Sequence, residues 1–129
     1  HEAAQALLGE HDFTSFRAKD CQAKSPIKTM HAITVKRWGS IIMVELEASA
    51  FLYHMVRNIV GVLLPIGEGH QPVEWMAEVL AQQDRTKAGV TAPGGGLYFV
   101  GVHYPAQFDI PCDPWGPALL EPILQLEAK

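Results

Sequence analysis

The sequence contains only two cysteines in 129 residues, Cys21 and Cys112. Two thiols are too few for a disulfide-dense scaffold or a four-thiolate zinc site, and they fit a protein of the reducing cytoplasm. The sequence also starts without a charged and apolar leader, so nothing in it indicates secretion. Its first residue is His1, already inside a helix-like pattern, and we expect the sequence to be cut from a longer chain.

Long uninterrupted apolar runs are also missing. The longest apolar stretch, residues 51–66, is broken by His54, Arg57 and Asn58. An arginine at the centre of a membrane span costs about 2.5 kcal/mol or more. We therefore expect a helix of a protein core here, because the sequence is 48% hydrophobic and can bury one.

Positive charge is scarce overall, since the net charge is −4 at pH 7. This balance excludes a globally basic nucleic-acid binder but not a local basic surface. Residues 13–40 contain six basic side chains and a single acidic one, Asp20. This region is suited to phosphate, and its basic residues are Arg17, Lys19, Lys24, Lys28, Lys36 and Arg37.

Periodicity predicts the elements of secondary structure. Residues 29–37 and 40–48 alternate apolar and polar side chains around a Trp-Gly-Ser turn, which predicts an antiparallel hairpin. We expect a short N-terminal helix, a helix over 51–66 capped by Ser49, a second helix starting near Pro72 and a central strand over 97–104. This order predicts an α+β fold, a mostly antiparallel sheet with helices packed on one face. We divide it into a domain at 1–104 and a proline-rich tail at 105–129.

One strip of the 51–66 helix is polar among apolar neighbours. At about 100° per residue, His54, Arg57, Asn58 and Gly61 fall on the same narrow strip. Arg57 either lies on a thin solvated edge or points into the protein, where it needs a carboxylate or a phosphate as partner. No acidic residue stands three or four positions away, so nothing local supplies that partner.

Residues 51–61, Phe-Leu-Tyr-His-Met-Val-Arg-Asn-Ile-Val-Gly, closely resemble the arginine-bearing helix of the tRNA pseudouridine synthase A family. Three further stretches resemble the same family in the same order, and together they cover nearly the whole chain. They are residues 12–17, 71–86 and 96–104.

The resemblance implies half of the pseudouridine synthase catalytic fold and an isomerase that needs no cofactor. Such enzymes convert uridine to pseudouridine at positions 38, 39 and 40 of the tRNA anticodon arm, through a nucleophilic aspartate, and act as homodimers. It also implies two catalytic-site residues in this chain. Arg57 pairs with the aspartate, and Leu97 is the apolar residue at the floor of the uracil site.

One family motif is missing. The family carries its nucleophile in an Arg-Thr-Asp-x-Gly-Val motif, and the nearest match here, residues 85–90, has Lys87 where aspartate is required. We therefore interpret the chain as the C-terminal half of such an enzyme, inactive without its N-terminal half. The alternative is a non-catalytic RNA-binding or dimerisation domain on the same scaffold, and a small-ligand domain using the glycines at 94–96 is a third.

Candidate RNA contacts come from the basic region. Arg17, Lys19, Lys24 and Lys28 follow two aromatic residues, Phe13 and Phe16, as in an aromatic and basic RNA surface. The competing interpretation is a pair of core phenylalanines beside ordinary solvated lysines. His54 either contacts RNA or satisfies a structural hydrogen bond. The six histidines show no zinc-binding spacing, so we expect no metal site.

Overall fold

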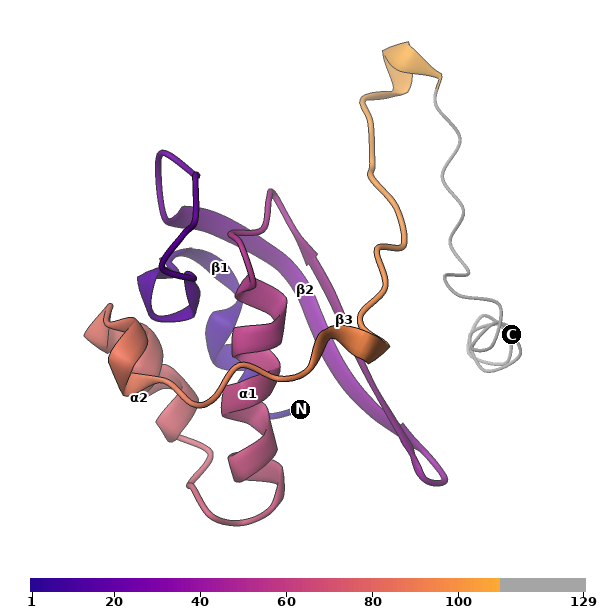
Figure 1. Ribbon diagram of the computed structural model, residues 1–129. Helices are drawn as coiled ribbons and strands as arrows, with labels where there is room; N and C mark the ends of the chain where they lie inside the picture. The colour runs from indigo at the N-terminus through magenta and orange to yellow at the C-terminus, as the bar shows by residue number, and fades with distance from the viewer. Residues whose placement is uncertain (110–129) are drawn as a thin grey trace. The chain divides into compact units, whose positions relative to one another are not determined.

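A computed structural model describes residues 1–109 of the chain (Figure 1). The chain forms two units, His1–Gly94 and a second that begins at Gly95, and each is described by itself. The first unit contains a three-stranded antiparallel sheet, in the order β1-β2-β3, and two α-helices. This confirms the predicted α+β class. No helix within residues 1–109 is long and apolar enough to cross a membrane.

Along the chain, short helices and one short strand precede a long hairpin, and helices follow it. The strands are β1 (Gly9–Asp12), β2 (Ile27–Trp38) and β3 (Ile41–Ala48), and the α-helices are α1 (Met55–Gly67) and α2 (Trp75–Gln82). The 3₁₀ helices are Ala3–Leu7, Thr14–Phe16, Arg85–Lys87, Gly94–Gly96 and Ala106–Phe108.

The β2–β3 hairpin confirms the prediction and extends it. Ile33 lies opposite Leu46 and Val35 opposite Val44, so the apolar residues of both strands share one face. The turn between the strands uses Gly39 at a φ of +61°, a conformation that glycine adopts without strain. The register shifts between Met30 and Ala32, and the extra residue of this bulge allows Met30 and Ile33 to join the same core.

The helices pack on the face of the hairpin that carries Met30 and Ile33. Figure 1 shows α1 and α2 on the same side of β2 and β3. Burying these apolar side chains is the main favourable contribution to folding. The core comprises Ala3, Ala4, Leu7, Phe13, Phe16, Met30, Ile33, Leu52, Met55, Ile59, Val62, Met76, Val79 and Leu80.

The predicted strand over residues 97–104 is wrong. Its alternating apolar residues fit an extended segment, but a strand needs a hydrogen-bonded neighbour, and none of residues 1–109 pairs with it. Its side chains are exposed, and Phe99 keeps 80% of its surface accessible. The third strand is instead β1, which pairs with the first part of β2. Sequence reasoning missed β1 because Gly-Glu-His-Asp contains no β-branched residue.

Two helix starts and one helix type also differ from the predictions. Helix α1 begins at Met55 rather than 51, and its N-cap is His54, while the Ser49 hydroxyl accepts a hydrogen bond from the Thr29 N–H at 3.0 Å. Helix α2 begins at Trp75, after a turn in which the Pro72 carbonyl accepts from the Trp75 N–H. The N-terminal helix is 3₁₀ rather than α. Most of the predicted tail, residues 110–129, lies outside the described residues, and the boundary at 104 stays a prediction.

Candidate active site around Arg57

Residues 85–92 pack on the polar strip of α1. The Arg57 carbonyl accepts a hydrogen bond from the Ala92 N–H at 3.1 Å. At Gly61 the two backbones approach so closely that a Cβ atom would lie 1.8 Å from the Val90 carbonyl oxygen. The strip is therefore not a solvated edge, and its glycine is required by this close approach.

Asn58 connects residues 85–92 and α1 to the rest of the first unit. Its side chain is only 1% exposed, and its Nδ2 donates to the Phe16 carbonyl at 2.8 Å. Its Oδ1 accepts from Arg85 Nη2 at 3.0 Å and from Thr91 Oγ1 at 2.6 Å. Arg85 Nη1 also donates to the Gly89 carbonyl at 3.0 Å. Arg85 thus holds its own loop against α1, a structural role for the stretch that imitates the family's nucleophile motif.

Arg57 is half-buried and held at two of its nitrogens. Its Nε donates to the Ala92 carbonyl at 2.8 Å, and its Nη1 lies 3.1 Å from His54 Nε2. Gly94 packs closely against the guanidinium, since a Cβ atom there would be 3.4 Å from Nε. Within residues 1–109, Nη2 has no hydrogen-bond partner and no carboxylate forms an ion pair with Arg57.

The position of Arg57 in the helix strengthens its positive potential. It lies in the first turn of α1, where the aligned peptide dipoles already give a partial positive charge. A cation is unfavourable there, and an anion is favoured. The Nη2 donors and the helix N-terminus together suit a carboxylate or a phosphate oxygen.

His54 lies next to Arg57 and packs against Tyr53. An arginine can only donate hydrogen bonds, so in this contact Nη1 is the donor and His54 Nε2 the acceptor, an arrangement that requires the ring proton on Nδ1. The His54 ring stacks on Tyr53 with centroids 3.9 Å apart. The Tyr53 N–H donates to the Cys21 sulfur at 3.4 Å, and the Tyr53 carbonyl accepts from the Ala18 N–H.

The sequence also matches a known family. A family model described as tRNA pseudouridine synthase matches residues 3–105. The chain belongs to the tRNA pseudouridine synthase family.

Curated relatives agree with this membership. The chain is 56% identical over 120 residues to tRNA pseudouridine synthase A of Cronobacter sakazakii, covering 93% of this chain and 44% of the relative. It is 55% identical to tRNA pseudouridine synthase A of Shewanella denitrificans and 52% identical to that of Photorhabdus laumondii, each over 93% of this chain and 46% of the relative. The chain therefore spans less than half the length of these relatives.

The basic region of this pseudouridine synthase chain differs from the aromatic and basic surface considered from the sequence. Phe13 and Phe16 are completely buried, so the core interpretation of the pair is confirmed. Arg17 Nη2 donates to the carbonyls of Ala23 and Cys21 and so holds the loop that follows it. Lys19 and Lys24 are exposed and Lys28 is half-buried.

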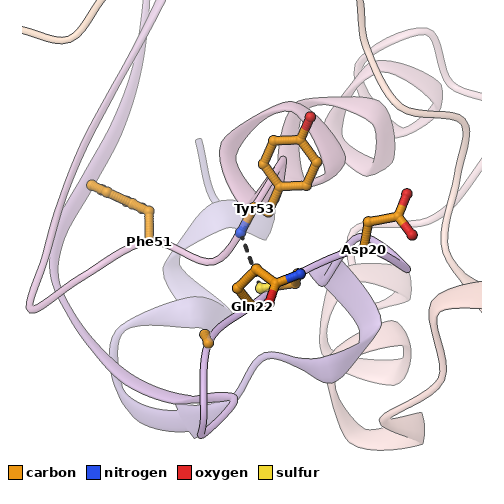
Figure 2. A pocket seen from close by; sticks show the side chains of 6 residues that line it. Asp20, Gln22, Phe51 and Tyr53 are labelled. Carbon is orange, nitrogen blue, oxygen red and sulfur yellow. Dashed lines mark hydrogen bonds between the residues drawn. The ribbon is translucent and has the colours of Figure 1, made fainter.

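The loop that Arg17 holds borders an open hollow of about 580 Å³, lined by Asp20, Cys21, Gln22, Ala23, Phe51 and Tyr53 (Figure 2). Its one charged side chain is the carboxylate of Asp20, so the hollow itself does not suit phosphate. The pKa of the Cys21 thiol is lowered, first by hydrogen bonds from the backbone of Tyr53 and Ala23 and then by Arg17.

Leu97 belongs to the second unit, where it is 47% exposed. Its place at the floor of a uracil site stays a prediction. Within residues 1–109, no three His, Cys, Asp or Glu side chains gather as metal ligands.

Proposed function

We propose that the full-length protein containing this chain isomerises uridine to pseudouridine at positions 38, 39 and 40 of the tRNA anticodon arm. Family membership and the names of the curated relatives support the reaction. The observation that carries the proposal is the hydrogen bonding of the Arg57 side chain. Its guanidinium is fixed by Ala92 and His54, while its Nη2 has no partner within residues 1–109.

In this proposal Arg57 is a catalytic residue that binds the nucleophilic aspartate. A guanidinium beside a carboxylate favours the ionised form and lowers its pKa, so the aspartate is available as a nucleophile at neutral pH. Planar donors also orient a carboxylate better than a point charge does. The target base must leave its stack to reach this carboxylate, as other base-modifying enzymes require.

The aspartate is supplied by the N-terminal half of the same enzyme. This chain spans 44–46% of its relatives, and its one motif-like stretch has lysine at the nucleophile position. The exposed apolar side chain of Leu97 supports its assignment to the uracil floor, since it is available to a base. The intact enzyme is proposed to be a homodimer that uses no cofactor.

The RNA contacts in this proposal are Lys19, Lys24 and Lys28, with Arg17 as a further candidate. The exposure of Lys19 and Lys24 supports these contacts, because flexible ammonium groups neutralise phosphates without a fixed geometry. Arg17 has Nη2 engaged with its own loop, which leaves its other donors for a phosphate. A tRNA substrate implies a cytoplasmic enzyme.

The test is pseudouridine formation on an unmodified tRNA by the intact enzyme. Arg57→Ala should abolish product while tRNA is still bound, because the aspartate loses its partner. Arg37→Ala is the control for the loss of a basic side chain. Arg37 is exposed at the hairpin, where its Nε donates to the Gly39 carbonyl, so its loss can change tRNA binding but should leave kcat unchanged. Full activity of Arg57→Ala would refute the proposal, and tRNA binding without product by the unchanged enzyme would favour the non-catalytic alternative.

A second experiment tests the division of the site between the two halves. The present chain alone should form no pseudouridine, and adding the N-terminal half should restore the reaction. Product formed by this chain alone would show that the nucleophile is not in the missing half.

A further inference from the structure

We infer that His54 is a positioning residue, which fixes the guanidinium of Arg57 rather than contacting RNA. The inference rests on the catalytic role proposed for Arg57. Its basis is the 3.1 Å contact between His54 Nε2 and Arg57 Nη1, together with the way His54 itself is held.

Two anchors define the plane of the guanidinium. The Ala92 carbonyl binds Nε at 2.8 Å, and His54 Nε2 binds Nη1. A planar group held at one nitrogen can still turn about its side chain, but one held at two nitrogens has a single orientation. His54 therefore determines the direction in which Nη2 points toward its anionic partner.

His54 is itself placed by three constraints. Its backbone is left-handed, with φ at 59°, which is unfavourable for a residue with a Cβ atom and persists only where the surroundings enforce it. Its ring stacks on Tyr53 at an interplanar angle of 25°. The Tyr53 backbone is bonded on one side to Ala18 and on the other to Cys21. Residues 18–21 thus fix Tyr53, Tyr53 supports the His54 ring, and His54 orients Arg57.

The first experiment compares His54→Gln with His54→Met in the intact enzyme. Both replacements are unbranched and bear the same cost of a left-handed backbone, but only glutamine offers an oxygen near the position of Nε2. We expect the Met variant to lose about tenfold in kcat and the Gln variant to stay within about threefold of the unchanged enzyme. The Kd for tRNA should be the same for all three proteins.

Three results would overturn the inference. Equal kcat losses in both variants would show that the hydrogen-bond acceptor at position 54 is not needed. Full activity in both variants would show that His54 itself is not needed. A weaker Kd for tRNA in both variants would assign His54 to RNA binding. These outcomes concern His54 alone, whereas an active Arg57→Ala enzyme would refute the proposed function itself.

A second measurement does not depend on catalytic activity. Nitrogen-15 spectra of histidine-labelled intact enzyme at pH 8 report which ring nitrogen carries the proton, and His54→Gln identifies the signal that disappears. We expect His54 to be protonated on Nδ1 only, because Nε2 accepts from Arg57. A proton on Nε2 would exclude this hydrogen bond and overturn the inference.

Discussion

Arg57 and Ala92 are joined twice, once through the backbone and once through the arginine side chain. The Ala92 N–H donates to the Arg57 carbonyl at 3.1 Å, and Arg57 Nε donates to the Ala92 carbonyl at 2.8 Å. The orientation of the guanidinium is therefore coupled to the packing of residues 88–92 on α1. That packing depends in turn on the absence of a side chain at Gly61.

Gly61→Ala should destabilise the protein and also reduce its activity. A Cβ atom at this position would lie 1.8 Å from the Val90 carbonyl oxygen, so residues 89–92 must move away from α1. We expect a loss of about 1–3 kcal/mol in the free energy of unfolding, measured by urea titration, together with a lower kcat because Ala92 moves with its segment.

Gly67→Ala is the matched control at the end of the same helix. No atom lies within 4 Å of a Cβ built there, so the substitution removes only the conformational freedom of glycine. It should leave stability unchanged or raise it by up to about 1 kcal/mol. Equal effects of the two substitutions would show that the close approach at Gly61 does not exist in solution.

Thr91→Val should weaken the anchor of the 85–92 segment. The Thr91 hydroxyl donates to Asn58 Oδ1 at 2.6 Å and accepts from Arg85 Nη2 at 2.8 Å, and valine has the same shape without these bonds. The expected loss is about 1–2 kcal/mol in the free energy of unfolding. Thr91→Ser keeps the hydroxyl and should lose less. A valine variant as stable as the serine variant would contradict this network.

The parts of the fold that the sequence predicts are those with a strong local pattern. Alternating β-branched residues predict the β2–β3 hairpin and its apolar face, and a 3.6-residue period places His54, Arg57, Asn58 and Gly61 on one strip. The strip is also the strongest functional signal in the sequence. Its covering segment is not predictable, because residues 85–92 contact it through backbone atoms and polar side chains, which leave no hydrophobic pattern.

The failed predictions depend on contacts distant in sequence. Residues 97–104 have the composition of a strand, but strand formation also needs a pairing partner, and composition says nothing about one. Helix α1 starts later than predicted because the backbone of Tyr53 is hydrogen-bonded to Ala18 and Cys21 instead of to the helix.

Exposed lysines and Arg17 should contribute differently to tRNA binding. Lys19→Ala and Lys24→Ala together should weaken binding and lower the slope of log Kd against log salt by about one unit for each phosphate that is no longer neutralised. They should leave stability unchanged, because both side chains are exposed. An unchanged slope would remove these lysines from the RNA surface.

Arg17→Ala should affect stability as well as binding. Its Nη2 holds the carbonyls of Cys21 and Ala23, so its removal loosens residues 18–23. If Arg17 also contacts a phosphate, the salt slope falls as it does for the lysines. A loss of stability with an unchanged slope would limit Arg17 to its structural role.

The Cys21 thiol should react with iodoacetamide at a lower pH in the folded protein than in the urea-unfolded protein. The folded-state pKa lies below its usual value because the Tyr53 N–H, the Ala23 backbone and then Arg17 favour the thiolate, and the thiolate is the reactive form. The thiolate accordingly stabilises the fold at alkaline pH, and this contribution is lost as pH falls through the folded-state pKa. Mass spectrometry of the peptide containing Cys21 gives the pH midpoint of alkylation, and identical midpoints in the folded and unfolded protein would show that the Tyr53 contact does not act on the thiol.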